Sequence, residues 1–443
     1  MDVFLAKGTR DLLPEQMHNR LHVMGIVRDV FARFGFEPLE TPAFERIETL
    51  LGKYGEEGDK LVFKILERGE GGREGKADLA LRYDLTVPLA RVMAMHPEIR
   101  LPFRRWQMQP VWRAERPQKG RFREFWQCDV DIVGAAGPLP DAECVAVVDT
   151  ALRELGFTSY TIRMNDRRIL SDLAKRAGAT DTKQEMSVLI ALDKLDKIGK
   201  DGVSAELERM GFAADGVAAL WAALAVEGGN AVVLDHLERS LDDRGREGVA
   251  TLRRVLEAAE ALGVDLARVQ IDPTLARGLD YYTGPVFETV VPNFSGSISG
   301  GGRYDGLIGM FSSKPMPAVG VALGLERILV VMEELGMLPK AQAAADVLVL
   351  LFDETTVIDA LRVAARLRAA GVRAETFPEV AKLGKQFKHA DARGYRWTIL
   401  AGPDEVAKGV VALKDLREGQ QHTLPLDQAI ATILGTTPAV LPP

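Results

Sequence analysis

Two alternating segments between Arg105 and Val133, joined by a short basic loop, constrain the fold of this chain most. In each segment, nearly every second residue is apolar. The residues between them are mostly polar or charged: Arg105, Gln107, Gln109 and Arg113 in the first segment, and Arg121, Arg123, Phe125, Gln127, Asp129 and Asp131 in the second. Successive strand side chains point to opposite faces, so the pattern predicts two strands with one apolar and one polar face. A solvated antiparallel sheet gives the same alternation. Arginines, an aromatic ring and carboxylates in this order favour instead a surface for a phosphate, a flat base and an amine.

The rest of the chain is typical of a large globular protein. Its 443 residues, 47% hydrophobic, predict two or three domains. Two cysteines, Cys128 and Cys144, are too few for a disulfide framework. Charged residues interrupt the first eleven positions, and no long apolar run follows, so we expect a cytoplasmic protein without a membrane anchor.

The charge is unevenly distributed along an acidic chain. A net charge of −7 does not suggest a general DNA- or RNA-binding protein. Residues 100–123, however, hold eight Lys/Arg and one acid, net +7, and residues 382–396 hold five and one, net +4. Such patches can hold polyphosphate or RNA backbone, although a solvated basic face is an equally good explanation for the second.

The periodicity divides the chain into four parts. We predict a first part of a mixed domain over 1–170, with helices at 14–34 and 141–156, and a helical insertion over 171–262. Strands resume in 263–336, beginning with 286–291. Beyond a connection at 336–340, residues 345–443 alternate strands (347–352, 372–377, 397–400, 410–415) with helices (354–370 and a basic one from 380), which predicts a separate α/β domain.

The motifs of the first segment resemble a known enzyme class. Arg113-Ala-Glu115, a loop, and Arg121-Phe-Arg-Glu-Phe125 resemble motif 2 of the class II aminoacyl-tRNA synthetases. Arginine forms bidentate bonds with phosphate and carboxylate, and an aromatic ring can stack on adenine. The strand near Phe36–Pro42 lies where that class carries motif 1, although proline-bearing strands are common.

Two further phrases narrow the resemblance to the histidyl-tRNA synthetase family. They are Arg277-Gly-Leu-Asp-Tyr-Tyr282 and Gly301-Gly-Arg-Tyr-Asp-Gly-Leu307. The second lacks both standard glycine-rich phosphate signatures, and by itself it also fits a bulged strand in which glycines permit close backbone approach. The resemblance extends from Lys7–Pro14 through Gly320–Arg327, which matches motif 3, to the terminal domain. It implies an α+β fold, with a mostly antiparallel sheet of about six strands flanked by helices, the helical insertion, and a C-terminal α/β anticodon-binding domain.

The resemblance also implies an L-histidine pocket. Its residues would be Asp84, Thr86, Arg113, Gln127, Asp131, Arg277, Tyr281, Tyr282 and Tyr304. The first two and Gln127 would hold the ammonium group, and the ring would lie between Asp131 and Tyr282. Other interpretations remain open: Asp84 can cap a helix, Thr86 can be a turn hydroxyl, and Tyr281 fits a packed core equally well.

ATP and its chemistry follow from the same resemblance. ATP would contact Arg113, Glu115, Arg121, Phe125 and Arg327, with Mg²⁺ on the polyphosphate. Arg277 and Arg113 would be the catalytic residues, stabilising charge at the α-phosphate in place of a metal bound by the protein. Glu326 is expected to be a structural partner. No Cys/His cluster has metal-ligand spacing, so no protein metal site is expected.

A homodimer and a histidine tRNA partner are also implied. Candidate tRNA contacts are Arg116, Gln118 and Lys119 in the loop, and Lys382, Lys385, Lys388 and Arg393 in the terminal domain. The leading alternative is a catalytically silent, histidine-binding regulatory relative that controls histidine biosynthesis. Such relatives generally lack the terminal domain and have eroded catalytic phrases. This chain has the terminal domain, and its catalytic phrases are intact. Prolyl- or threonyl-type enzymes lack the Arg-Gly-Leu-Asp-Tyr-Tyr phrase.

Overall fold

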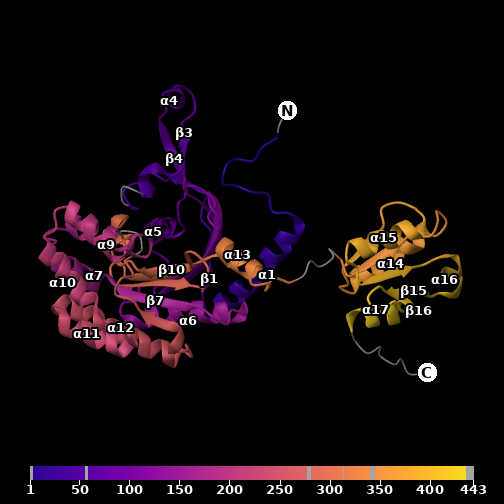
Figure 1. Ribbon diagram of the computed structural model, residues 1–443. Coiled ribbons are helices and arrows are strands. Elements are labelled where there is room, and N and C mark those ends of the chain that lie inside the picture. The colour runs from indigo at the N-terminus through magenta and orange to yellow at the C-terminus, as the bar shows by residue number, and fades with distance from the viewer. Residues whose placement is uncertain (1–2, 55–57, 277–280, 313, 340–344, 436–443) are drawn as a thin grey trace. The chain divides into compact units, whose positions relative to one another are not determined.

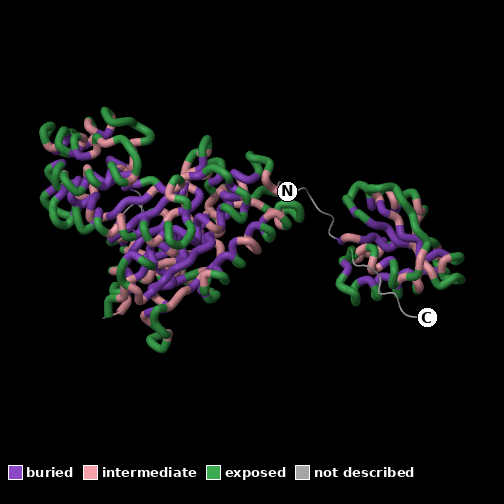
Figure 2. Tube along the Cα trace, turned by 90° about the horizontal axis from the view of Figure 1, so that it is seen from below, coloured by how far each residue is buried: buried purple, intermediate pink, exposed green. Residues whose placement is uncertain are grey.

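The protein divides into two compact units. The computed structural model describes residues 3–54, 58–276, 281–312, 314–339 and 345–435. One unit comprises Met1–Leu12 and Asn19–Leu338, and the other comprises Leu13–His18 and Pro339–Pro443, within those described ranges (Figure 1). Buried residues follow the central strands of each unit, and exposed residues cover the outer helices and loops (Figure 2).

An eight-stranded sheet forms the centre of the larger unit. Its strands are β1 (Glu37–Pro38), β5 (Phe103–Trp112), β6 (Glu124–Val133), β11 (Ala318–Gly324), β10 (Ser297–Arg303), β9 (Pro285–Val290), β7 (Thr161–Asp166) and β8 (Val269–Ile271), in that spatial order. All neighbours pair antiparallel except the two outermost pairs, β1–β5 and β7–β8. The sheet has two strands more than the six or so predicted, because its edge strands are only two and three residues long and leave little periodicity in the sequence.

Helices cover the apolar face of this sheet. The helices α1 (Pro14–Arg33) and α6 (Pro138–Glu154) bury their apolar residues in one core with Cys128, Val130 and Ile132 of β6. Gly35, shortly after the end of α1, has φ +75°, a conformation that glycine adopts readily where a helix ends. The helix α13 (Leu325–Glu334) follows β11 directly and packs on β6 and β10.

The predicted helical insertion is a succession of helices, with a break at Gly199, whose backbone is not helical (φ +70°). It consists of α7 (Arg167–Arg176), α8 (Thr182–Leu192), α9 (Leu195–Arg209), α10 (Ala214–Leu224), α11 (Asn230–Ser240) and α12 (Asp243–Ala261). Aspartates cap three of these helices: Asp166, Asp181 and Asp242 each accept a bond from a backbone N–H of the first turn. The helix α12 packs against α6, so the insertion shares one continuous apolar core with the sheet.

A small antiparallel sheet projects from the same unit (Figure 1). Its strands, in spatial order, are β2 (Phe44–Arg46), β4 (Ala77–Leu81) and β3 (Lys64–Leu66). The short helices of this region are α2 (Ile47–Leu50) and α4 (Glu70–Arg73). The chain then enters α5 (Thr86–Met95), whose first turn carries Asp84 and Thr86 to the polar face of the main sheet.

The second unit has the predicted α/β alternation. Its sheet has the order β13 (Ala374–Thr376), β12 (Val347–Leu350), β14 (Trp397–Leu400), β15 (Val411–Asp415) and β16 (Gln421–Leu424). The first three strands are parallel and the last two antiparallel. The helices are α14 (Val357–Ala369), α15 (Leu383–Ala392), α16 (Pro403–Lys408) and α17 (Leu426–Leu434).

Candidate active site

The paired strands β5 and β6 form the floor of the site. Their register places Arg105 opposite Asp131, Gln107 opposite Asp129, and Val111 opposite Phe125. The polar face of these strands is buried: Arg105 and Gln107 are both 0% exposed. A solvated sheet face is therefore wrong, because a buried row of charged groups must be paired or occupied rather than hydrated.

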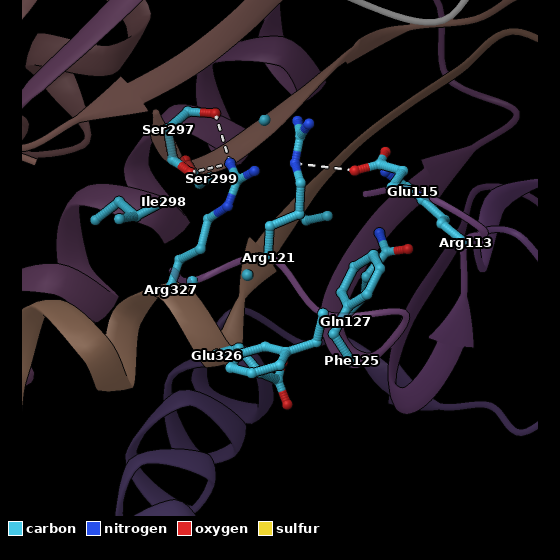
Figure 3. Close-up of a pocket in the computed structure, with 15 residues that line it drawn as sticks. Arg113, Glu115, Arg121, Phe125, Gln127, Ser297, Ile298, Ser299, Glu326 and Arg327 are labelled. Atoms are coloured by element: carbon cyan, nitrogen blue, oxygen red, sulfur yellow. Dashed lines mark hydrogen bonds and ion pairs between the residues drawn. The ribbon is translucent and has the colours of Figure 1, made fainter. Parts of the chain in front are cut away.

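A pocket of about 200 Å³ opens above this floor. Its lining brings together all five residues predicted to contact ATP, namely Arg113, Glu115, Arg121, Phe125 and Arg327, with Gln127, Gly324 and the start of β10 (residues 297–300). Figure 3 shows these side chains directed toward a common space from β6, the loop before it, β10 and α13. Arg121 and Arg327, which are 206 positions apart in the sequence, thus line the same cavity.

The pocket arginines are held in place by short polar contacts. Arg121 Nε lies 2.9 Å from Glu115 Oε2. Arg327 Nη1 donates to the Ser297 carbonyl at 2.6 Å (Figure 3). Arg113 Nε donates to the Tyr83 carbonyl at 3.1 Å. The Arg113 guanidinium also lies 5.1 Å from the centroid of the Phe125 ring, within the range of a cation–π contact. These cations are thus oriented rather than free to rotate.

The glycine-rich phrase serves close packing as well as the pocket. Strand β10 has a register shift between Ser297 and Ser299, so the bulged-strand interpretation holds. A Cβ on Gly301 would lie 2.1 Å from the Gly320 carbonyl oxygen, and one on Gly320 would lie 1.9 Å from Asp131 Oδ1. Glycine is required at both positions because the backbones of β10 and β11 and a pocket carboxylate approach so closely.

A second cluster of acids and phenols adjoins the nucleotide-sized pocket. Asp84 Oδ1 accepts from the Val87 N–H at 3.0 Å, so Asp84 does cap the first turn of α5. Its carboxylate also accepts from the hydroxyls of Tyr54 and Tyr281, each at 3.2 Å. Asp131 accepts from the Tyr304 hydroxyl. The ring of Tyr281 lies edge-on to those of Tyr282 and Tyr304, with centroids 5.0 and 5.9 Å away, so Tyr281 is both a core residue and a wall of this cluster.

The charge balance of this cluster is negative. Asp84, Asp129 and Asp131 are all buried, and burial raises the pKa of each carboxyl above its usual value. Two guanidinium groups, Arg105 and Arg113, face these three acids. The Oε1 atom of Gln127 is buried without a hydrogen-bond partner among the described residues. The cluster therefore offers an unmatched negative charge and an open acceptor, which suits a cationic amine.

Several residues of the cluster were not predicted to be site residues. They are Tyr54, Tyr83, Arg105, Gln107 and Asp129. The alternation did place the last three on the polar face predicted to be a binding surface, but no individual role was predicted for them. Nothing in the sequence near Tyr54 signals its contact with Asp84, which lies 30 positions away.

The remaining predicted residues fall into three groups. Arg277 lies outside the described residues. In the loop between β5 and β6, Arg116 and Gln118 are exposed, and Lys119 forms an ion pair with Glu334 of α13. In the second unit, Lys382, Lys385, Lys388 and Arg393 are all exposed along α15 or at its ends, with Lys385 Nζ 2.7 Å from Glu379 Oε1.

Glu326 behaves as the structural partner expected from the sequence. It is buried, forms an ion pair with Arg20 of α1, and accepts from the backbone N–H of Trp126 at 2.8 Å. It thereby ties α13 to α1 and β6 directly beneath the pocket. Within the described residues, no group of three or more His, Cys, Asp and Glu side chains is arranged to hold a metal ion, and no helix is long and apolar enough to cross a bilayer.

The sheet, the pocket and the motif 2 hairpin define a class II aminoacyl-tRNA synthetase catalytic domain. A family model described as histidyl-tRNA synthetase matches residues 8–328, and one described as anticodon binding domain matches residues 346–436. The chain belongs to the histidyl-tRNA synthetase family.

Individual relatives agree over the full length. The chain is 41% identical to the histidine–tRNA ligase of Christiangramia forsetii, over 95% of this chain and 96% of that protein. It is 42% identical to the histidine–tRNA ligase of Gloeobacter violaceus, over 97% of each. The crystal structure of histidyl-tRNA synthetase from Nostoc sp. PCC 7120 matches with a TM-score of 0.85 and 32% identity, covering 98% of this chain and 99% of that one.

Proposed function

We propose that this chain is a histidine–tRNA ligase, which activates L-histidine with ATP and transfers it to the 3′ end of histidine tRNA. The observation that carries the proposal is the single pocket lined by Arg113, Glu115, Arg121, Phe125 and Arg327 beside the buried acid-and-phenol cluster. A cationic cavity with an aromatic wall suits a nucleoside triphosphate, and the anionic cluster suits an amino acid with a basic ring.

ATP would lie in the 200 Å³ pocket. Phe125 offers a face for the adenine and Glu115 an acceptor for its amino group. Arg113 would bind the α-phosphate, and Arg121 and Arg327 the β- and γ-phosphates, because guanidinium groups bind phosphate oxygens bidentately. The Glu115–Arg121 pair would then open so that each partner contacts a different part of the nucleotide.

Mg²⁺ would accompany the polyphosphate rather than occupy a protein cage. The two carboxylates that line the described pocket are already engaged, Glu115 by Arg121 and Glu326 by Arg20. The ion would supply charge neutralisation on the phosphates, and the chain's own arginines would do the rest.

Histidine would occupy the acid-and-phenol cluster. Asp84, Thr86 and the open Oε1 of Gln127 would receive the ammonium group, and Asp131 and the tyrosines 281, 282 and 304 would surround the ring. Hydrogen bonding to a ring nitrogen excludes analogues that lack it, because a buried polar group would remain unpaired. Sites of this kind discriminate by roughly 10⁴–10⁵, so no editing domain is needed.

The first chemical step is attack of a histidine carboxylate oxygen on the α-phosphorus. The bond to the β-phosphate oxygen breaks, pyrophosphate leaves, and histidyl-adenylate forms. Catalysis by the chain is positioning plus stabilisation of negative charge on the non-bridging oxygens by Arg113 and, by analogy with the family, Arg277. In the second step, the 3′-hydroxyl of the terminal adenosine attacks the carbonyl carbon and AMP leaves.

The tRNA would contact both units. Arg116, Gln118 and Lys119 stand at the tip of the loop that bounds the pocket, where an acceptor end must enter, and the exposed cations of α15 suit an RNA backbone. We also propose a homodimer and a cytoplasmic location. The regulatory alternative is disfavoured, because the described pocket arginines and the anticodon-binding domain are both present.

The test is ATP–pyrophosphate exchange measured with each of the twenty amino acids. The proposal expects exchange with histidine alone, followed by aminoacylation of histidine tRNA. Histidine binding without any exchange would support the regulatory alternative, and exchange with another amino acid would overturn the proposal.

A further inference from the structure

A fully buried arginine lies beside the acid-and-phenol cluster, on the same face of the sheet, and is not among the residues that line the pocket. Arg105 of β5 is 0% exposed, yet it carries a charge that must be balanced. Its Nη2 atom lies 2.6 Å from Asp131 Oδ2 and 3.9 Å from Asp129 Oδ2. The same guanidinium donates to Gln107 Oε1 at 3.1 Å and to the Leu85 carbonyl at 3.3 Å.

These contacts fix where Asp131 points. Tyr304 donates to Oδ1 of Asp131 on one side, and Arg105 approaches Oδ2 on the other. Gly320, directly opposite Asp131 on β11, leaves room for the carboxylate that a Cβ would block at 1.9 Å. Oδ2 accepts no hydrogen bond of good geometry from the described residues, so its accepting capacity remains for a ligand.

The charged surroundings explain why the arginine is needed. The ionisable groups around Asp131 are Arg105 and Asp129 on the same floor, Tyr304 and Tyr282 above it, and Cys144 of α6 below it. Among these groups, Arg105 is the cation. Burial raises the pKa of Asp131, and Arg105 opposes that rise. Without the cation, Asp131 would be protonated more readily and would become a hydrogen-bond donor.

We propose that Arg105 is a positioning residue for recognition of the histidine ring: from the neighbouring strand of the floor it holds Asp131 as a hydrogen-bond acceptor for an imidazole N–H. The inference rests on the proposed function and deepens it. Asp131 would accept the hydrogen bond from the ring nitrogen that carries the proton. Arg105 would act through Asp131, without touching the substrate. The two residues face each other directly across β5 and β6, so the hairpin register itself sets their geometry.

The experiment compares Arg105→Gln and Arg105→Lys with the wild type in histidine-dependent pyrophosphate exchange from pH 6 to pH 8.5. The quantity measured is the KM for histidine of the variant divided by that of the wild type. The ionisation of free histidine affects both KM values equally, so it does not change this ratio. For Arg105→Gln the ratio should be about tenfold or more at pH 6 and decline as pH rises, because deprotonation restores the acceptor. The KM for ATP should stay within about twofold.

Arg105→Lys should show a smaller ratio with little pH dependence, because the charge is kept and the forked geometry is lost. The matched control is Arg104→Gln on the same strand. Arg104 points to the opposite face, where it pairs with Glu143 of α6, so its loss should leave the KM for histidine and its pH profile unchanged.

A pH-independent ratio near one for Arg105→Gln would overturn the inference, as would equal increases in the KM values for histidine and ATP. If Arg105→Gln does not fold, Arg105→Lys decides: a ratio that falls steeply with pH despite the retained charge would overturn it. Failure of the proposed function is a separate result, because the wild type itself would then show no histidine-dependent exchange.

Discussion

Glu115 and Arg121 face each other across the loop between β5 and β6, with 2.9 Å between Glu115 Oε2 and Arg121 Nε. The two side chains line the same pocket, so the site neutralises one of its own cations (Figure 3). An ion pair of this kind keeps the arginine at the cavity wall until a stronger anion, such as a polyphosphate, competes for it.

Arg121→Ala should therefore weaken ATP binding with little effect on histidine. A lost charge-assisted bond to phosphate costs about 1.5–3 kcal/mol, which corresponds to a KM for ATP raised roughly 10- to 150-fold. Pyrophosphate exchange at varied ATP and histidine concentrations measures both values. Arg209→Ala, on the surface of α9, is the control. A KM for histidine that rises as much as that for ATP would contradict the assignment.

Arg277→Ala should lower the adenylation rate by at least ~100-fold, by analogy with loss of one preorganised transition-state donor. This prediction rests on the sequence motif alone, since residue 277 lies outside the described part of the chain. Single-turnover formation of histidyl-adenylate at saturating substrates isolates the chemical step. Exchange near the wild-type rate would remove Arg277 from the catalytic set.

Asp129→Asn should stabilise the ligand-free protein near neutral pH and weaken histidine binding. Burial raises the pKa of the Asp129 carboxyl well above its usual value. The folded protein therefore binds more protons than the unfolded chain between the two pKa values, and its stability falls as pH rises through that window. Asparagine lacks this penalty, so the melting temperature should rise by about 1–3 °C at pH 7.5, and the gain should disappear in acid below the unfolded pKa.

Calorimetry at several pH values, with and without histidine, measures this trade-off. The same variant should need more histidine for the same thermal shift, because the acid-and-phenol cluster has lost one of its three carboxyl groups. A lower melting temperature at pH 7.5 would mean that the contact with Arg105 at 3.9 Å outweighs the burial of Asp129.

Gly301→Ala should destabilise the larger unit. The added Cβ would meet the Gly320 carbonyl oxygen at 2.1 Å, a backbone atom that cannot move without disturbing the β10–β11 pairing. Overpacking of this kind costs about 1–3 kcal/mol. Thermal unfolding measures it, and Gly306→Ala is the matched control, because its Cβ would meet nothing within 4 Å. Equal melting temperatures for the two variants would contradict the close approach.

Reversing the charges at Lys382, Lys385 and Lys388 on α15 should weaken tRNA charging and leave adenylation unchanged. Each lost phosphate contact reduces affinity and its salt dependence. The KM for tRNA in aminoacylation, measured beside pyrophosphate exchange, separates the two steps. Each reversal is also made singly, and Arg362→Glu on the exposed face of α14 is the control with the same charge change as one reversal. Equal losses in charging and exchange would indicate misfolding instead.

Local patterns predicted much of the fold. The helix at 14–34, the helical run after residue 171, and the strand at 397–400 all appear, with α1 at Pro14–Arg33 and β14 at Trp397–Leu400. Each carries its periodicity, caps or turn residues within its own segment. The strand predicted near Phe36–Pro42 appears only as β1 at Glu37–Pro38, and β8 was not predicted, because two or three residues acquire strand geometry only from the neighbour with which they pair.

The sequence by itself determined the two faces of β5 and β6, five of the residues that line the pocket and the family of the chain, because alternation and motif spacing are properties of the chain alone. Only the tertiary structure decided that the polar face is buried, that Tyr54 reaches Asp84, and that Arg105 forms an ion pair with Asp131. The physical reason is that burial and charge pairing depend on what packs above and below a strand. That packing is set by segments that are distant in sequence. The hydrophobic periodicity within one segment does not specify which distant segments pack against it.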